Sequence, residues 1–367
     1  MNYSARLAKV IRRLEESELD GTIITHLANV RYLCGFTGSS GVLACARGEW
    51  AFFTDGRYTA QARAQVKGAT VNVESVPPLA LAARWLAGKF KRSKSAARIG
   101  VEGEHLTLAM QTRINSEMRR LAAKSKYRLV PTSEMVEQFR MKKDATELAQ
   151  IRKAIHLASG IFPEALKALR PGVTENDFAA ELEHLARRAG AEKMSFETIV
   201  AAGRHSALPH ARPTLNRIGK GFVVLDYGVI LGGYCSDMTR TVCVDRPNKS
   251  QRALYSAVLE AQLAGISAVR SGVQAQQVDA AARDVLKRHK LDQYFTHSLG
   301  HGVGIEIHEA PRLAKGQTQT LEPGMVVTIE PGAYIPGRGG VRIEDVVLVT
   351  SNGCEVLTPT PKELVTC

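Results

Sequence analysis

Three histidines lie within 12 residues of one another in the stretch THSLGHGVGIEIHEAPRL: His297, His301 and His308. Imidazole nitrogens ligate transition metals and exchange protons near neutral pH, so the stretch has the residues for either chemistry. Glycines on both sides of His301 leave room for an ion to approach. They also disfavour a helix that would place His297 and His301 on one face for zinc. By itself the stretch is equally compatible with polar residues scattered along a strand.

Two aspartates lie in the otherwise apolar stretch GFVVLDYGVILGGYCSDMTRTVCV, at Asp226 and Asp237. The pair Gly232-Gly233 predicts a turn between them. A hairpin folded near Leu231-Gly232, with paired residue numbers summing to 463, places the two aspartates opposite each other on one face. Opposed carboxylates repel, and burying them unpaired is costly, whereas a shared divalent cation removes both penalties. For this pair alone, one hydrogen-bonded buried aspartate and one exposed aspartate fit equally well.

Two glutamates repeat this arrangement further along the chain. GMVVTIEPG ends an apolar strand at Glu330, and GGVRIEDVVLV begins another that carries Glu344. One imidazole and four carboxylates suit two divalent ions about 3.5–4 Å apart that share bridging carboxylates and a water molecule. This oxygen-rich set favours Mn²⁺, with Fe²⁺, Co²⁺ or Zn²⁺ as alternatives. The candidate metal ligands are Asp226, Asp237, His301, Glu330 and Glu344.

The patterns along the chain predict two domains, as expected for 367 residues. Residues 1–21 have the apolar spacing of an amphipathic helix. Strands are predicted at 19–26 and 41–46, and a strand leading into a helix at 49–66. A charged helical region at 132–162 contains the boundary, near 138–144. Further helices are predicted at 174–191, with Thr174 as its cap, and at 251–270 and 276–290. The remainder of the C-terminal part has strand patterns, which makes it α+β with a mostly antiparallel, curved sheet.

Composition excludes several classes of protein. No apolar run reaches 18 residues, so no membrane span is expected. The net charge of +13 comes from scattered basic groups without a zinc-finger or RNP-like pattern, which favours a solvated basic surface over a nucleic-acid site. Six cysteines without a CxxC pair, and no export signal, indicate reduced thiols in a cytoplasmic protein.

Taken in order, the segments SALPHARP, LDYG, SDMTRT, HSLGHGVGIEIHEAP, TIEPG and VRIED resemble the pita-bread (M24-type) metallopeptidases. The similarity is to their Xaa-Pro aminopeptidase and prolidase branch. NVRYLCGFTGSSG (29–41) and FFTDGRYTAQA (52–62) more diffusely resemble the creatinase-like N-terminal domain of the same branch. The resemblance implies a creatinase-like domain over 1–138 and a pita-bread catalytic domain over 144–367. It also implies a homo-oligomer, most simply a dimer.

The resemblance also implies a role for each site residue. Asp226 would chelate one metal ion, His301 and Glu330 the other, and Asp237 and Glu344 would bridge both. Glu330 would in addition carry the proton of the attacking water. The remaining implied contacts are catalytic for His210, His297 and His308, and substrate-binding or orienting for Arg312, Arg342 and Tyr227. For Tyr227, packing on the opposite face of its strand is the alternative.

The expected activity is that of a dinuclear Xaa-Pro aminopeptidase, which uses a metal-bridging hydroxide to cleave before a proline at position two. The short connection from His308 to Glu330 lacks the arginine-bearing insertion of many prolidases and favours this reading. The alternatives are a prolidase restricted to Xaa-Pro dipeptides and a non-catalytic pita-bread binding protein. A metal-free creatine-type hydrolase is disfavoured because all five ligands are present. His205 departs from the family, which usually has asparagine there, and a loop role is favoured for it over a ligand role.

Overall fold

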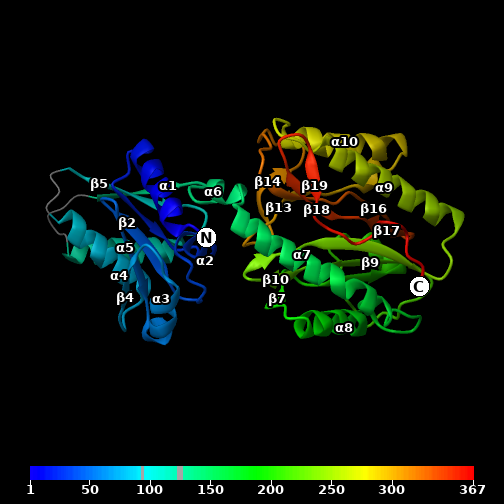
Figure 1. Cartoon of the computed structure of the whole chain (residues 1–367), viewed down its shortest axis with the longest axis horizontal. Coiled ribbons are helices and arrows are strands. Elements are labelled where there is room, and N and C mark those ends of the chain that lie inside the picture. The colour runs from blue at the N-terminus through cyan, green and yellow to red at the C-terminus, as the bar shows by residue number, and fades with distance from the viewer. Residues whose placement is uncertain (92–94, 122–126) are drawn as a thin grey trace. The chain divides into compact units, whose positions relative to one another are not determined.

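The chain forms two compact units, Met1–Arg140 and Met141–Cys367. The computed structural model describes residues 1–91, 95–121 and 127–367 (Figure 1). Buried apolar clusters lie within each unit, so each has a core of its own. Among the helices in these ranges, none combines the length and apolar character needed to cross a bilayer.

A six-stranded mixed sheet forms the centre of the first unit, in the order β4-β3-β2-β1-β5-β6. Its strands are β1 (Gly21–Ile24), β2 (Val42–Ala46), β3 (Glu49–Thr54), β4 (Thr70–Val73), β5 (Ala97–Glu102) and β6 (Tyr127–Thr132). The first three pair antiparallel, while β4, β5 and β6 join the sheet in parallel. The strands predicted at 19–26, 41–46 and from 49 onward are confirmed.

Helices complete the first unit: α1 (Tyr3–Glu16), α2 (Leu27–Cys34), α3 (Thr59–Gln65), α4 (Pro78–Phe90), α5 (Leu108–Leu121) and α6 (Glu137–Met141). The predicted N-terminal helix is α1, which buries Leu7, Val10 and Leu14 on one face. The side chain of Asn2 caps it by accepting a hydrogen bond from the Ala5 amide at 3.1 Å.

The second unit has four long helices: α7 (Ala145–Leu166), α8 (Glu175–Arg188), α9 (Lys249–Ala268) and α10 (Ala275–Arg288). Thr174 caps α8 as predicted, because its hydroxyl accepts a hydrogen bond from the Asp177 amide at 3.0 Å. The strands are β7 (Lys193–Met194), β8 (Ile199–Ala202), β9 (Gly221–Tyr227), β10 (Val229–Leu231), β11 (Tyr234–Cys235), β12 (Met238–Val244), β13 (Gly300–Gly302), β14 (Glu309–Leu313), β15 (Val326–Ile329), β16 (Gly332–Ile335), β17 (Gly339–Arg342), β18 (Asp345–Val349) and β19 (Cys354–Val356).

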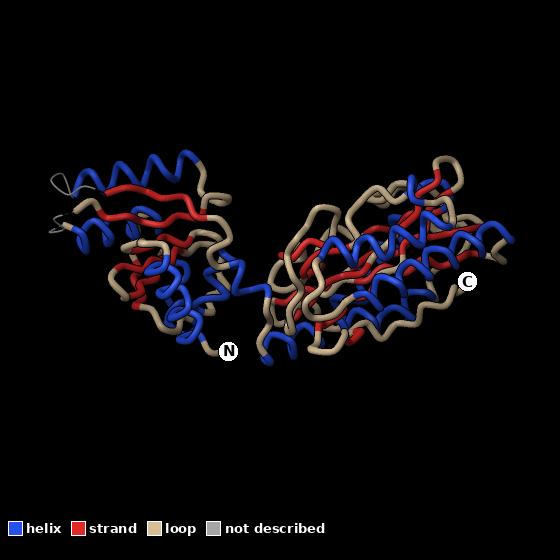
Figure 2. Tube along the Cα trace, turned by 90° about the horizontal axis from the view of Figure 1, so that it is seen from above, coloured by secondary structure: helices blue, strands red, loops and turns tan. Residues whose placement is uncertain are grey.

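All strand pairs of the second unit are antiparallel, as predicted. They form the sheets β11-β10-β7, β12-β9-β8, β14-β13-β15-β18-β19 and β16-β17. One apolar cluster joins α7 and α8 to β9 and β12, and another joins α9 and α10 to β14–β18. The strands therefore lie between two helix pairs (Figure 1; Figure 2).

The second unit contains one arrangement twice, which no repeat in the sequence had indicated. Before α8, the Gly172 amide donates to the Ile218 carbonyl and the Ile218 amide to the Val173 carbonyl, at 2.9 and 2.8 Å. Before α10, 100 residues later, Gly272, Leu321 and Val273 make the same two bonds at the same distances. Each half thus consists of a helix pair followed by strands.

The hairpin that carries the two aspartates has a different register from the predicted one. Leu231 pairs with Tyr234, and Asp226 pairs with Thr239, so paired numbers sum to 465. Both Gly232 and Gly233 have positive φ, +59° and +73°, and therefore occupy the two central positions of the turn. Because side chains alternate with period two, a shift of two residues keeps Asp226 and Asp237 on the same face.

Candidate metal centre

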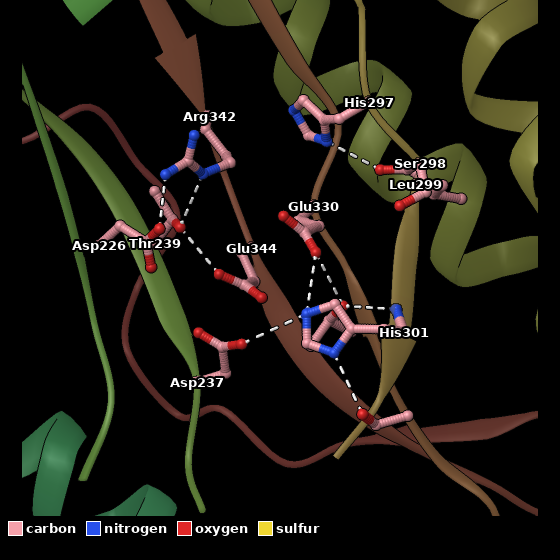
Figure 3. Close-up of polar contacts among 12 residues, drawn as sticks. Asp226, Asp237, Thr239, His297, Ser298, Leu299, His301, Glu330, Arg342 and Glu344 are labelled. Carbon is pink, nitrogen blue, oxygen red and sulfur yellow. Dashed lines mark hydrogen bonds and ion pairs between the residues drawn. The ribbon is translucent and has the colours of Figure 1, made fainter. Parts of the chain in front are cut away.

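The five predicted ligands are brought to one cavity of about 750 Å³ from both halves of the second unit. Asp226 lies in β9, and Asp237 directly precedes β12. His301 is the central residue of β13, Glu330 directly follows β15, and Glu344 lies between β17 and β18. Strand ends therefore supply most of the donors, and Figure 3 shows their side chains directed toward a common space.

His301 faces two of the carboxylates. Its Nε2 is 3.6 Å from Oδ2 of Asp237 and 3.3 Å from Oε1 of Glu330. Its Nδ1 donates to the Gly302 carbonyl at 3.1 Å, which orients the ring so that Nε2 faces the acids. Donor atoms of Asp237, His301 and Glu344 also lie within 4.8 Å of one another, a spacing that one ion can bridge.

The glycines beside His301 allow the neighbouring strands to approach closely, in addition to leaving room at the site. A Cβ atom on Gly300 would lie 2.0 Å from the Thr328 carbonyl oxygen, and one on Gly302 would lie 2.3 Å from that of Ala310. Such contacts are impossible for any larger residue. The strands on each side of His301 therefore approach so closely that glycine is required, which supports the predicted absence of a helix there.

Unsatisfied carboxylate oxygens show that the residues fit divalent ions. Among the described residues, Oδ1 of Asp226 and Oε1 of Glu344 are buried without a hydrogen-bond partner. Burial, reinforced by neighbouring carboxylates, raises the pKa of Asp226, and raises those of Asp237 and Glu344 well above their ordinary values. A cation coordinated by these oxygens would satisfy the orphaned atoms and relieve the mutual repulsion.

Arg342 orients one side of this cluster. Its Nη2 donates to Oδ2 of Asp226 at 2.5 Å, and its Nε donates to the Thr239 hydroxyl at 3.1 Å. That hydroxyl in turn donates to Oε2 of Glu344 at 2.8 Å (Figure 3). Each bound carboxylate keeps its other oxygen for an ion. The arrangement agrees with the orienting role expected for Arg342.

A directed chain of hydrogen bonds runs from Arg342 to His297. Nη1 of Arg342 donates to the Tyr334 hydroxyl at 2.7 Å, and this hydroxyl lies 2.9 Å from Nε2 of His297. Nδ1 of His297 lies 2.8 Å from the Ser298 carbonyl, which can only accept. Burial lowers the pKa of His297, so the neutral ring donates from Nδ1 and accepts from Tyr334 at Nε2.

Two polar residues of this network, Thr239 and Tyr334, were missed from the sequence. Thr239 is two residues after Asp237 and so shares its face of the strand, which is a signal that alternation supplies. Tyr334 lies in β16, opposite Gly340 of β17, and only the pairing of these strands brings it to Arg342. No pattern in the sequence singles it out.

The cavity wall contains His210, His308 and Arg312, together with His297 and Arg342. The ring centroids of His301 and His308 are 4.4 Å apart, edge to face. Burial, and then the neighbouring His301, lower the pKa of His308. Arg312 is exposed at this wall, and apolar surface comes from Phe196 and Ile307.

The structure contradicts the substrate-binding role suggested for Tyr227. This residue is fully buried in the cluster formed with α7 and α8, and its hydroxyl donates to the Ala158 carbonyl at 2.8 Å. Because Tyr227 is adjacent to Asp226 on one strand, alternation points it to the opposite face. The alternative of packing away from the cavity is the correct one.

A second group of potential ligands, His26, His105 and Glu137, lies in the first unit. The two imidazole rings are stacked, with centroids 3.7 Å apart and planes inclined by 14°. Lone pairs in nearly parallel planes do not converge on one ion. The group is therefore better described as two rings beside a carboxylate, whose Oε1 accepts a hydrogen bond from Asn29 at 2.6 Å.

Comparison with known proteins agrees with this geometry. Residues 149–351 match the model of metallopeptidase family M24, and residues 6–142 match the creatinase/prolidase N-terminal domain. The chain belongs to family M24. The predicted family and the architecture of a creatinase-type domain followed by a pita-bread domain are both confirmed.

Relatives of this M24 chain include an "Xaa-Pro dipeptidase" of Pyrococcus furiosus, 36% identical over 98% of this chain and 99% of the relative. A solved Xaa-Pro dipeptidase from Bacillus anthracis superposes with a TM-score of 0.92, at 38% identity and full coverage of both chains. An X-Pro aminopeptidase from Thermotoga maritima superposes with a TM-score of 0.86, at 32% identity, over 97% of this chain and 100% of the other.

Proposed function

We propose that this M24 chain is a metal-dependent Xaa-Pro aminopeptidase that releases the first residue of peptides with proline at position two. The observation that carries the proposal is the convergence of His301 with four carboxylates, two of which retain an unsatisfied buried oxygen. The names of the relatives add support for cleavage before proline. The proposal assigns Asp226, Asp237, His301, Glu330 and Glu344 as the residues that would hold two ions, with Mn²⁺ the preferred metal.

Bound divalent ions would supply a water molecule acidic enough to ionise near neutral pH and would polarise the scissile carbonyl. The residues of the chain divide the remaining work. Burial opposes ionisation of Glu330, but its hydrogen bond with His301 and the charge of that ring lower its pKa to about 2. Its carboxylate is therefore ionised at neutral pH and can take a proton and pass it to the leaving prolyl nitrogen.

His308 is the ring best suited to stabilise the developing oxyanion. Its lowered pKa keeps it neutral, so it offers a ring N–H in the cavity without the cost of a second buried charge. His297 was expected to share this role, but both of its ring nitrogens are engaged by Ser298 and Tyr334. We assign His297 a positioning role instead.

Proline selectivity is explained by shape. A prolyl nitrogen has no N–H, so the site needs no acceptor for it, and Phe196 and Ile307 supply apolar walls for the ring. The length of the substrate depends on what covers the cavity. No helix or strand intervenes between β14 and β15, which are fully described, and this short connection favours longer peptides and thus the aminopeptidase.

A dipeptidase is the second candidate, and Arg312 favours it. This exposed arginine lines the cavity and could bind the carboxylate of an Xaa-Pro dipeptide. The deciding experiment strips the protein with EDTA, restores Mn²⁺, and offers Ala-Pro, Ala-Pro-Ala and Ala-Ala-Ala. Metal-dependent release of alanine from Ala-Pro-Ala alone among the tripeptides supports the aminopeptidase. Cleavage of Ala-Pro only would make the protein a dipeptidase, and no cleavage of either would overturn both.

A further inference from the structure

A loop between β8 and β9 carries part of the cavity wall. It leaves β8 at Ala202 and contributes His210 and Arg212 to the cavity. The chain then contacts the start of α8 at Thr214, whose carbonyl accepts from the Asn176 amide at 3.0 Å, and bridges Thr174 at Arg217. Its middle is held by Arg342, whose Nη1 donates to the Pro209 carbonyl at 3.0 Å. The position of His210 therefore depends on how firmly the two ends of the loop are fixed.

One buried carboxylate fixes both ends. Glu175, the first residue of α8, is completely buried. Its Oε1 accepts from the Ala202 amide at 2.8 Å, and its Oε2 accepts from the Thr214 amide and hydroxyl at 3.1 and 2.6 Å. Nδ1 of His205 lies 2.9 Å from both oxygens and is the only one of these donors that belongs to the loop interior.

The internal repeat shows that the fold does not need this carboxylate. In the second half, Ala275 occupies the position equivalent to Glu175, at the start of α10. The backbone bonds are nevertheless the same: the Glu175 amide donates to Asn216 at 3.0 Å, and the Ala275 amide to Gln319 at 2.9 Å. The turn forms without an acid there. Glu175 therefore has a task that the helix start does not explain.

We propose that Glu175 and His205 are positioning residues that set the place of His210 in the cavity. The proposal rests on the proposed function in one respect, because it takes His210 to contact the substrate. The imidazole of His205 is the fourth hydrogen-bonding group at the Glu175 carboxylate, and it connects the loop interior to α8. Without it the loop keeps its two ends and the bond from Arg342 to Pro209, but its interior loses the tie to α8.

His205→Ala is the informative variant, because Glu175 retains three donors and the unit still folds. We expect kcat/KM for Ala-Pro-Ala to fall about 10- to 100-fold, as when a supporting group is removed from an active site. His205→Asn places an amide N–H near the position of Nδ1 and should restore most of the activity. His184→Ala, an exposed histidine on α8, is the matched control and should behave as wild type.

Two further readouts separate positioning from general damage. Melting temperature and bound-metal content should be unchanged in His205→Ala, and its effect should largely vanish in a His210→Ala background. Amide hydrogen exchange of residues 203–214 should rise in His205→Ala and return toward wild type in His205→Asn. Unchanged exchange, or equal losses in both His210 backgrounds, would overturn the proposal. If the wild-type protein cleaves no peptide, only the proposed function fails. The hydrogen-exchange measurement then still tests whether His205 holds the loop in place.

Discussion

The hydroxyl group of Tyr334 lies 2.9 Å from Nε2 of His297 and connects that ring to Arg342, which holds Asp226. The bond means that one chain of hydrogen bonds orients both a cavity histidine and the carboxylate of a proposed metal ligand. In a buried network of this kind, the loss of one partner costs more free energy than at the surface, because a polar group is then left without a hydrogen bond.

Tyr334→Phe removes this connection while preserving the ring. We expect kcat/KM on an Xaa-Pro substrate to fall at least about tenfold, because His297 loses its donor and Arg342 loses an acceptor. Steady-state kinetics and metal analysis of the same preparation would measure it. Tyr294→Phe, on a partly buried tyrosine outside the cavity, is the control. Wild-type kinetics in Tyr334→Phe would show that the chain of hydrogen bonds is dispensable.

Asp237→Ala tests the ligand assignment. Asp237 faces His301 and is surrounded by buried carboxylates, so its loss should abolish both tight metal binding and peptidase activity. Metal content after dialysis and activity with Mn²⁺ report the two effects separately. Asp284→Ala, an exposed aspartate on α10, should retain both. A metal-loaded, fully active Asp237→Ala protein would be incompatible with the assigned site.

The pH dependence of stability follows from the pKa shifts. Burial raises the pKa of Asp237 and Glu344, and despite burial the hydrogen bond with Glu330 and nearby acids raise that of His301 to about 9. Without metal, the folded state thus binds more protons than the unfolded state above the ordinary carboxylate pKa. Its stability should therefore fall as pH rises. Bound ions displace these protons, so the stabilisation that metal provides should increase as pH rises.

Thermal melts in EDTA and in Mn²⁺ at about pH 5 and about pH 8 test this linkage. The difference in melting temperature between the two conditions should be larger at the higher pH. Glu330, whose pKa is about 2, stays ionised across this window and does not alter the sign. An equal difference at both pH values would contradict the assigned protonation states.

Arg312 separates the two candidate activities. Arg312→Ala should leave kcat/KM for Ala-Pro-Ala within about threefold of wild type if the enzyme is an aminopeptidase. For a dipeptidase, the loss of a carboxylate partner should raise KM for Ala-Pro about tenfold or more, with a smaller effect on kcat. Arg212→Ala, on an arginine of the same cavity that is paired with Glu197 at 2.9 Å, provides a comparison.

The alternation of side chains along a strand predicted which residues share the site more reliably than the predicted pairing of the strands did. The register of the Asp226 hairpin was wrong by two residues, yet the aspartates share a face, because an even shift preserves the alternation. The same rule indicated that Tyr227 could face away from Asp226, as the structure shows. Alternation is a local property, so it is readable from the sequence.

Relationships between distant strands were not readable. Tyr334 joins His297 to Arg342 only because β16 pairs with β17, which brings the tyrosine to the arginine. The two halves share little beyond the glycine and valine at 172–173 and 272–273, so the repeat is a property of the backbone. The role of His205 likewise depends on Glu175, 30 residues away and in another element.

Both halves of the second unit contribute to the cluster of proposed metal ligands. Asp226 and Asp237 come from the first half, whereas His301, Glu330 and Glu344 come from the second. Neither half alone contains enough donors for two ions. A chain that has been synthesised only as far as α9 therefore lacks three of the five proposed ligands. Under the proposed function, hydrolysis would require the second half to be in place, so a partly synthesised chain would not act as a peptidase.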